Sequence, residues 1–217
     1  MLTKLIKEPA LDPEICIIWM HGLGADGSDM AQLASQLTVP SLAIRHVFLD
    51  APIRSVHINQ GMPMRAWYNI FDFALTNRED RKGILESQAA INEVIEEQCQ
   101  EGFTPSQIFL AGFSQGGVMA LFTGLHMTKP LGGIIALSSY LPLSADCNAT
   151  VDKNIPIFFA YGRQDPLVLP LWSEMTLDWL NAANFSNLTR YDYPMEHQVC
   201  AEELADLSHW LRAQVKR

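Results

Sequence analysis

The sequence predicts an α/β protein with a mostly parallel central sheet and helices on both of its faces. Short apolar runs typical of buried strands alternate along the chain with segments whose apolar residues recur at helical spacing. Parallel neighbours in a sheet need long crossover connections, which helices provide while they cover the sheet. The 217 residues are 48% hydrophobic, and we find no linker, repeat or low-complexity segment, so we expect one domain spanning 1–217.

The first buried strand is expected at residues 15–20, a continuous apolar run that suits a strand covered on both faces. It leads into a glycine-rich loop at residues 21–27. This loop has neither the G-x-G-x-x-G nor the Gly-Lys-Ser/Thr spacing of a nucleotide-binding loop. His21, Asp26 and Asp29 lack the spacing of metal ligands, so we expect no metal and no cofactor.

Apolar residues at helical spacing indicate a helix in the middle of the chain and another near its end. The residues that define them are Ile91, Val94 and Ile95 in the middle of the chain, and Leu204, Leu207, Leu211 and Val215 near its end. Strand-like runs at 108–111, 155–160 and 188–193 lie among the helical segments. The alternation of the two patterns therefore extends over nearly the whole chain.

Residues 112–116 read Gly-Phe-Ser-Gln-Gly, a G-x-S-x-G pattern with Ser114 at its centre. The strand-like run 108–111 precedes it, and a helical pattern through Val118, Leu121 and Leu125 follows it. This order of strand, sharp turn and helix is typical of the nucleophile elbow of the α/β-hydrolase fold, in which the serine hydroxyl is exposed at the top of the sheet. We therefore expect Ser114 to be a catalytic nucleophile.

A serine nucleophile in this fold is followed along the chain first by an orienting acid and then by a histidine base. Asp165 comes just after the run 155–160, at the carboxyl end of a strand, where such an acid belongs. His197 lies in a loop between the run 188–193 and the last helix. The five other histidines either precede Ser114 or fall where helices are expected. We therefore predict a triad of Ser114, Asp165 and His197.

Acyl transfer also needs hydrogen-bond donors for the oxyanion that forms on the substrate. In this fold one donor is the N–H of the residue after the nucleophile, here Gln115, and the other comes from the loop after an early strand, here assigned to the N–H of Leu23. Because both donors are main-chain groups, we expect side-chain substitutions at these two positions to affect catalysis less than substitution of Ser114, unless they bend the loop.

Six segments in register make the chain resemble the phospholipase/carboxylesterase family, in particular bacterial carboxylesterases related to acyl-protein thioesterases. They are His21–Gly27, Leu49–Pro52, Pro63–Tyr68, Gly112–Gly117, Tyr140–Pro142 and Asp165–Val168. The resemblance spans about residues 15–210 and implies the same triad and the same two oxyanion donors. Asn69 and Ser139 depart from the residues usual in the family, and we expect them to affect local loop geometry and substrate choice.

An acyl-binding groove is expected beside Ser114. Phe71, Phe73 and Leu75 precede a polar loop expected at 76–82 and are assigned to one wall, while Leu167 and Val168 after the predicted acid are assigned to the other. Trp67 and Ile70, from the same apolar region, are expected in the core instead. The segment 71–75 has a second interpretation as a contact in a homodimer.

Charge and composition narrow the partners. A formal net charge of −9 argues against nucleic acid and against electrostatic capture by anionic lipid. The N-terminal residues lack a signal-peptide core, and no run is long enough to cross a bilayer, so we expect a cytoplasmic protein. The four cysteines show no disulfide or zinc spacing, although Cys200 lies close enough to His197 in the sequence to keep a redox or nucleophilic role open.

These observations leave three hypotheses for function. The first is a carboxylesterase that acts on small-molecule esters of short to medium acyl chains through an acyl-enzyme. The second is a thioesterase or lysophospholipase that acts on longer, lipid-like acyl groups. The third is a binding protein that has kept the hydrolase fold without catalysis, and the intact order of the triad argues against it.

Overall fold

The structure is a computed structural model that describes residues 2–40, 42–72, 74 and 78–215. Its central sheet has seven strands, in the spatial order β1 (Thr3–Lys7), β3 (Ile44–Asp50), β2 (Ile15–Met20), β6 (Ile108–Phe113), β7 (Gly133–Leu137), β8 (Ile157–Gly162) and β9 (Leu188–Tyr193). Only the pair of β1 and β3 is antiparallel, and every other neighbouring pair in this sheet is parallel. The mostly parallel sheet expected from the sequence is confirmed.

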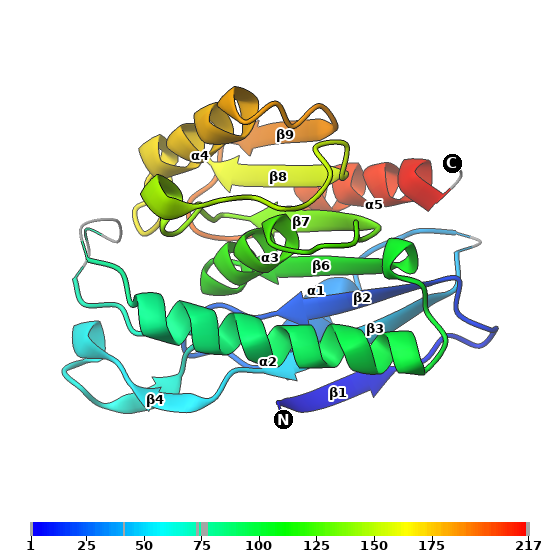
Figure 1. Cartoon of the computed structure of the whole chain (residues 1–217), viewed down its shortest axis with the longest axis horizontal. Coiled ribbons are helices and arrows are strands. Elements are labelled where there is room, and N and C mark those ends of the chain that lie inside the picture. The colour runs from blue at the N-terminus through cyan, green and yellow to red at the C-terminus, as the bar shows by residue number, and fades with distance from the viewer. Residues whose placement is uncertain (1, 41, 73, 75–77, 216–217) are drawn as a thin grey trace.

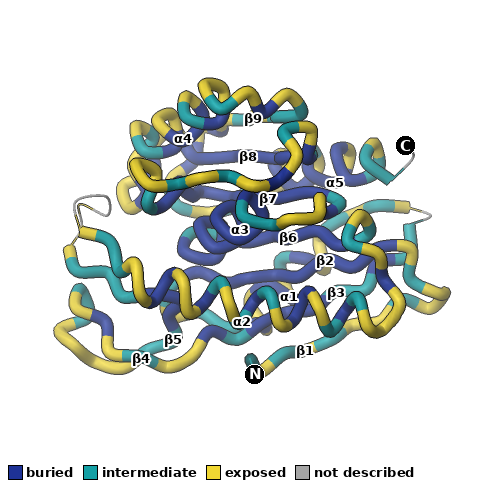
Figure 2. Tube along the Cα trace, viewed as in Figure 1, coloured by how far each residue is buried: buried dark blue, intermediate teal, exposed yellow. Residues whose placement is uncertain are grey.

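Helices cover both faces of the sheet (Figure 1). On one face lie α2 (Arg81–Gln100), α3 (Gln115–Leu125) and α4 (Pro170–Ala182), and on the other lie α1 (Gly27–Ala34) and α5 (Ala201–Val215). The central strands β2, β6, β7 and β8 are buried almost along their whole length (Figure 2), because each is covered on both faces. Their continuous apolar runs are therefore a direct consequence of their central place in the sheet.

Shorter elements surround the carboxyl ends of the strands. They are the hairpin of β4 (Ile53–Ser55) and β5 (Pro63–Arg65) and the single 3₁₀ turns η1 (His57–Asn59) and η3 (Ser144–Asp146), whereas the turn η2 (Pro105–Gln107) lies at the amino end of β6. Asn69 connects to η1 through two hydrogen bonds, accepting from the His57 N–H at 2.9 Å and contacting the His57 ring at Nδ1 at 2.7 Å. This side chain, one of the two departures from the family pattern, therefore fixes η1.

Two expected boundaries differ from the structure. The polar segment 76–82 was expected to be a loop, but α2 begins at Arg81 because the Asp80 carboxylate accepts a hydrogen bond from the Gly83 N–H at 3.0 Å and caps the helix. The strand expected at 155–160 begins two residues later and extends to Gly162, since its first paired residue is Ile157. Neither shift alters the fold.

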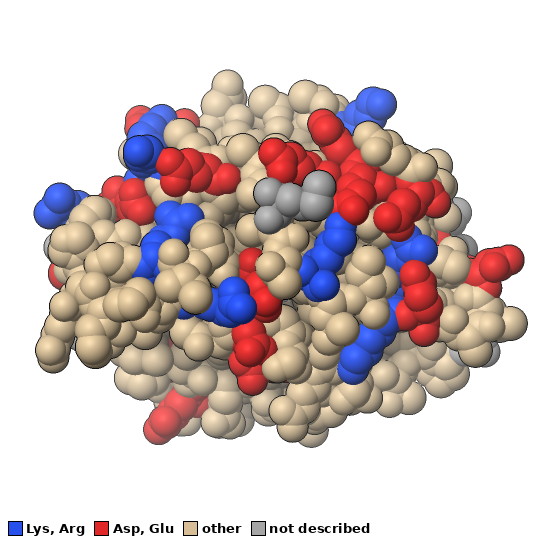
Figure 3. All heavy atoms as spheres, turned by 90° about the horizontal axis from the view of Figure 1, so that it is seen from below, with Lys and Arg blue, Asp and Glu red and all other residues tan. Residues whose placement is uncertain are grey.

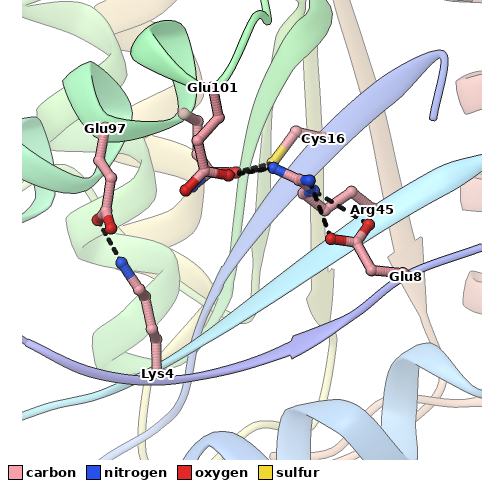
Figure 4. Close-up of polar contacts among 7 residues, drawn as sticks. Lys4, Glu8, Cys16, Arg45, Glu97 and Glu101 are labelled. Carbon is pink, nitrogen blue, oxygen red and sulfur yellow. Dashed lines mark hydrogen bonds and ion pairs between the residues drawn. The ribbon is translucent and has the colours of Figure 1, made fainter. Parts of the chain in front are cut away.

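The edge strand β1 is protected by charge. Lys4 of β1 pairs with Glu97 of α2, while Arg45 of β3 lies between Glu8 and Glu101 (Figure 4). Seen from this edge, acidic and basic side chains lie interspersed (Figure 3). Lysines and short length are common means by which edge strands avoid pairing with other chains, and the same ion pairs connect the C-terminal end of α2 to the sheet.

Glu203, in the first turn of α5, is fully buried, and neither of its carboxylate oxygens has a hydrogen-bond partner among the described residues. Burial raises the pKa of this carboxyl to about 8 from an ordinary value of 4.5. The folded protein therefore holds a proton on Glu203 that the unfolded chain releases at lower pH. The stability from this group is fully present below about pH 4.5 and is lost as the pH rises to about 8.

We predict that Glu203→Gln, which stays neutral, removes this part of the pH dependence. As the pH rises from 5 to 8.5, the free energy of unfolding of the variant should increase relative to that of the native chain by on the order of 1–4 kcal/mol. Urea unfolding at the two pH values measures it. Glu202→Gln changes an exposed neighbouring carboxylate and should leave the profile as it is; a Glu203→Gln profile parallel to the native one would contradict the prediction.

Candidate active site

Ser114 lies at the sharp turn between β6 and α3, with φ of 56° and ψ of −122°. A non-glycine residue rarely adopts this backbone conformation, and such strain is concentrated at functional sites. Two glycines permit the turn. A Cβ added at Gly112 would lie 2.2 Å from backbone atoms of Gly116, and one added at Gly116 would lie 2.0 Å from the Met20 carbonyl oxygen. The G-x-S-x-G pattern is thus required by close backbone packing.

The loops after β8 and β9 bring the other two predicted triad residues to Ser114. The Arg163 N–H donates to the Tyr193 carbonyl at 2.8 Å and the Gln164 N–H to the Met195 carbonyl at 3.1 Å, so the two loops are bound to each other. Gly162 makes the contact possible, because a Cβ there would lie 2.4 Å from the Met195 carbonyl oxygen. Asp165 and His197 are therefore positioned by loops that form one structural unit.

Ser114, His197 and Asp165 form a continuous hydrogen-bonded chain. The distance from Ser114 Oγ to His197 Nε2 is 2.8 Å, and that from His197 Nδ1 to Asp165 Oδ2 is 2.7 Å. An ionised carboxylate can only accept a hydrogen bond, so its contact with His197 requires the proton of the neutral ring to be on Nδ1. Nε2 then carries no proton and can accept from the serine hydroxyl. The geometry is that of a nucleophile, a base and an orienting acid.

The Asp165 carboxylate is held rigidly in this arrangement. Its side chain is fully buried. Its second oxygen accepts from the Leu167 N–H at 2.8 Å and from the Val168 N–H at 2.9 Å, which fixes the orientation of the carboxylate. On the other side of the base, the Phe113 ring packs on the imidazole with centroids 4.8 Å apart. These contacts leave His197 little freedom to rotate away from Ser114.

Leu23 and Gln115, the predicted oxyanion donors, line the same cavity as Ser114 and His197. Within the described part of the chain, neither backbone N–H donates to a protein acceptor, as expected for Gln115 at the first position of a helix. The loop carrying Leu23 approaches the nucleophile closely, since a Cβ added at Gly22 would lie 3.4 Å from the Ser114 Cβ. The two N–H groups are thus free to bind an oxygen atom near Ser114.

The Gln115 side chain has a structural function that was not apparent from the sequence. It is buried, its Oε1 accepts from the Trp67 N–H at 2.8 Å, and its Nε2 donates to the Tyr68 carbonyl at 2.7 Å. Trp67 in turn donates from its indole Nε1 to the His21 carbonyl at 2.9 Å. Trp67 is fully buried, as expected, and connects the nucleophile turn to the loop that carries Leu23.

A cavity of about 470 Å³ lies beside Ser114, within the size range usual for small-molecule sites. Leu167 and Val168, which were expected to form one wall, line it. Phe71 is not among its lining residues. Its ring packs on that of His57, with centroids 5.0 Å apart, and the Arg78 guanidinium carbon lies 4.0 Å from the Phe71 ring centroid. Phe73 and Leu75 lie outside the described residues.

Most of the apolar wall comes from residues that sequence reasoning did not select. They are Met30, Leu33, Ile58, Tyr68, Ile70, Tyr140 and Val199. Ile70, expected in the core, is only half-buried and faces the cavity, where it lies next to Ile58 because the Ile58 N–H donates to the Ile70 carbonyl at 3.1 Å. The one available signal was the apolar density of residues 62–75, which Ile70 shares with Phe71.

The cavity wall carries little charge. Among the described lining residues, Asp29 at the rim is the one carboxylate, and no lysine or arginine is present. Burial raises the pKa of both Tyr68 and Tyr140, whose hydroxyl oxygens lie 3.3 Å apart, so both stay neutral. The cavity is therefore suited to an uncharged, apolar group.

The described residues contain neither a metal-binding cluster nor a membrane-spanning helix. No group of His, Cys, Asp and Glu side chains there is arranged to hold a metal ion. No helix in that part of the chain is long and apolar enough to span a bilayer. Cys200 is half-buried, and its Sγ accepts from the Glu203 N–H at 3.5 Å, which places it as a contact of α5.

We predict that Gln115→Ala destabilises the protein. It would leave the Trp67 N–H and the Tyr68 carbonyl buried without partners, at a cost of roughly 1–3 kcal/mol for each group in the free energy of unfolding. Chemical denaturation measures the loss, and Gln32→Ala, at an exposed position of α1, is the matched control. Equal stability of the two variants would show that the two hydrogen bonds contribute nothing to folding.

Comparison with known proteins places this geometry in a family. A family model described as phospholipase/carboxylesterase matches residues 2–215. The acyl-protein thioesterase 1 of Mycosarcoma maydis is 36% identical and covers 97% of this chain and 96% of that protein. The protein of the same name from Neurospora crassa is also 36% identical, over 97% of this chain and 93% of its own length.

Solved structures agree with the sequence relatives. The crystal structure of Arabidopsis thaliana SOBER1 matches with a TM-score of 0.85 and 27% identity, covering 93% of this chain and 99% of that one. The Zea mays acyl-protein thioesterase 2 shares the fold, with a TM-score of 0.80 and 24% identity over 98% of this chain and 99% of that one. The chain therefore belongs to the phospholipase/carboxylesterase family and is a hydrolase of the α/β-hydrolase fold.

Proposed function

We propose that the protein is a serine hydrolase that cleaves carboxylic esters of short to medium acyl chains through an acyl-enzyme. The observation that carries the proposal is the hydrogen-bonded chain of Ser114, His197 and Asp165, which lies beside an apolar cavity and two backbone N–H groups that donate to no acceptor among the described residues. Nucleophile, base, acid and oxyanion donors are the complete set of groups that acyl transfer requires.

In the proposed mechanism His197 Nε2 takes the Ser114 proton as the oxygen attacks the carbonyl carbon. The Leu23 and Gln115 N–H groups stabilise the negative charge that develops on the substrate oxygen. Asp165 holds the ring in the tautomer that can accept and stabilises the imidazolium. The imidazolium then protonates the leaving group, and a water molecule activated by the same base releases the acid and restores Ser114.

Thioesters are the second candidate substrates. Two observations favour them: the curated relatives at 36% identity are acyl-protein thioesterases, and the cavity is apolar and nearly uncharged. An acyl chain enters such a cavity whether its carbonyl is bonded to oxygen or to sulfur, so the catalytic groups serve both reactions. A lysophospholipid ester belongs to the same candidate, since it also presents a long acyl chain. A cytoplasmic location and a homodimer remain predictions from the sequence.

We predict that Ser114→Ala abolishes ester hydrolysis, lowering kcat by about 10⁴–10⁶-fold, since the acyl-enzyme can no longer form. Asp165→Asn should lower kcat by about 10⁴-fold, because the amide donates to Nδ1 and favours the tautomer that cannot accept from Ser114. Steady-state hydrolysis of a p-nitrophenyl ester measures both. Labelling of the native chain, but not of Ser114→Ala, by a fluorophosphonate is the control. Near-native hydrolysis by purified Ser114→Ala would refute the proposed nucleophile.

We also predict that, in a series of p-nitrophenyl esters from acetyl to palmitoyl, kcat/KM rises with acyl length up to a short or medium chain and then falls. Each methylene buried in the cavity should contribute up to about 0.8 kcal/mol until the cavity is full. Ile58→Trp, which reduces the cavity, should shift the optimum to shorter chains, whereas Ile53→Trp, at an exposed position of the hairpin, should not. An optimum at palmitoyl would overturn the short-to-medium assignment in favour of the long-chain candidate.

A further inference from the structure

His21 is a fully buried histidine that the mechanism above does not use. It follows the last residue of β2 and immediately precedes the loop that carries Leu23. Its Nε2 accepts from the Ala51 N–H at 3.0 Å, and its Nδ1 lies 2.7 Å from the carbonyl oxygen of Gly22. Both ring nitrogens therefore have main-chain partners.

The two partners fix the protonation of the ring. A carbonyl oxygen can only accept, so Nδ1 carries a proton, and the Ala51 N–H can only donate, so Nε2 has none. Burial also lowers the pKa of His21 below its ordinary value. The side chain is thus a neutral imidazole with one donor and one acceptor in fixed positions.

The Gly22 carbonyl belongs to the same rigid peptide unit as the Leu23 N–H. Because a trans peptide is planar, with its carbonyl and N–H directed oppositely, a hydrogen bond that holds the carbonyl also sets the direction of the N–H. The Ala25 N–H also donates to this carbonyl, at 3.2 Å, a longer contact than the one from His21. His21 therefore provides the shorter of two hydrogen bonds on this peptide.

We propose that His21 is a positioning residue for the oxyanion hole: its Nδ1–H holds the Gly22 carbonyl so that the Leu23 N–H points at the substrate oxygen. The inference rests on the proposed function, because it assigns His21 to a donor of that mechanism. Ala51 and Trp67 hold His21 itself in place, through the ring and through the His21 carbonyl respectively. Preorganised donors stabilise an oxyanion because they need no reorientation during the reaction.

Two variants separate the ring nitrogens. In His21→Asn the side-chain amide nitrogen takes the place of Nδ1 and can still donate to the Gly22 carbonyl. In His21→Gln the amide oxygen reaches toward the place of Nε2 and can still accept from the Ala51 N–H, while the donor to Gly22 is lost. If His21 acts through the Gly22 carbonyl, His21→Asn should retain activity and His21→Gln should not, although both variants alter a buried side chain.

The matched control is His46→Gln. His46 is a partly buried histidine of the neighbouring strand β3 that accepts from the Trp19 indole N–H at 3.0 Å and lies outside the cavity. Burial lowers the pKa of His46 to about 4, so it too is a neutral, hydrogen-bonded ring. Its substitution reports the cost of losing a buried histidine contact without touching the loop that carries Leu23.

The measurement is kcat and KM with one p-nitrophenyl ester, at a temperature where each variant is fully folded by circular dichroism. His21→Gln should lower kcat by about 10–100-fold, less than the 10²–10³-fold cost of removing an oxyanion donor outright, with KM nearly unchanged. Inhibition by a trifluoromethyl ketone, whose adduct places an oxyanion in the hole, should weaken by a similar factor. His21→Asn and His46→Gln should stay within a few-fold of the native kcat.

Native kcat and native inhibition in folded His21→Gln would overturn the inference, as would equal losses in the Asn and Gln variants. If the proposed function itself is wrong, the result is different, because Ser114→Ala would then remain active and residues other than Ser114 would carry out the reaction. If His21→Gln does not fold, His21→Asn is compared with His46→Gln instead. A loss in kcat of more than about 10-fold in folded His21→Asn, without a similar loss in His46→Gln, would contradict the role of the Gly22 contact.

Discussion

Gly116, in the first turn of α3, packs against the end of β2 so closely that an added Cβ would lie 2.0 Å from the Met20 carbonyl oxygen. This contact brings the nucleophile turn of β6 against the loop that follows β2. The two strands are already neighbours in the sheet, with Met20 paired to Gly112. Ser114 and the loop carrying Leu23 are consequently fixed to each other by backbone packing, and the remaining parts of the site are arranged around this contact.

A second layer of polar contacts secures the same arrangement from the side of the hairpin. Trp67 donates from its indole to the His21 carbonyl and from its backbone N–H to the Gln115 side chain, while its own carbonyl accepts from the Ser87 hydroxyl of α2. The Gln115 side chain and the His21 carbonyl, two residues before Leu23, are thus both bound to this one residue. Buried polar groups that are fully paired in this way specify a single conformation.

The parts of the molecule that could be predicted from sequence are those with local signals. The turn around Ser114 follows from glycines that backbone contact requires, and Asp165 and His197 follow from strand ends and chain order. The cavity wall could not be predicted in the same way, because Met30, Ile58 and Val199 come from three separate segments that only the tertiary structure brings together. Phe71 was assigned to the cavity wall in place of Ile70 for the same reason, because nothing in the local sequence shows which of the two side chains faces the cavity.

The origin of the cavity wall has an evolutionary consequence. Ser114, the proposed nucleophile, stands at the end of the central strand β6, where neighbouring backbone leaves no room for change, whereas much of the apolar wall comes from α1, the η1 turn and the segment that carries Tyr68 and Ile70. Peripheral segments of this kind tolerate substitution and insertion better than strand ends do. Members of a lineage with this architecture can therefore diverge in the acyl groups they accept while their reaction stays the same.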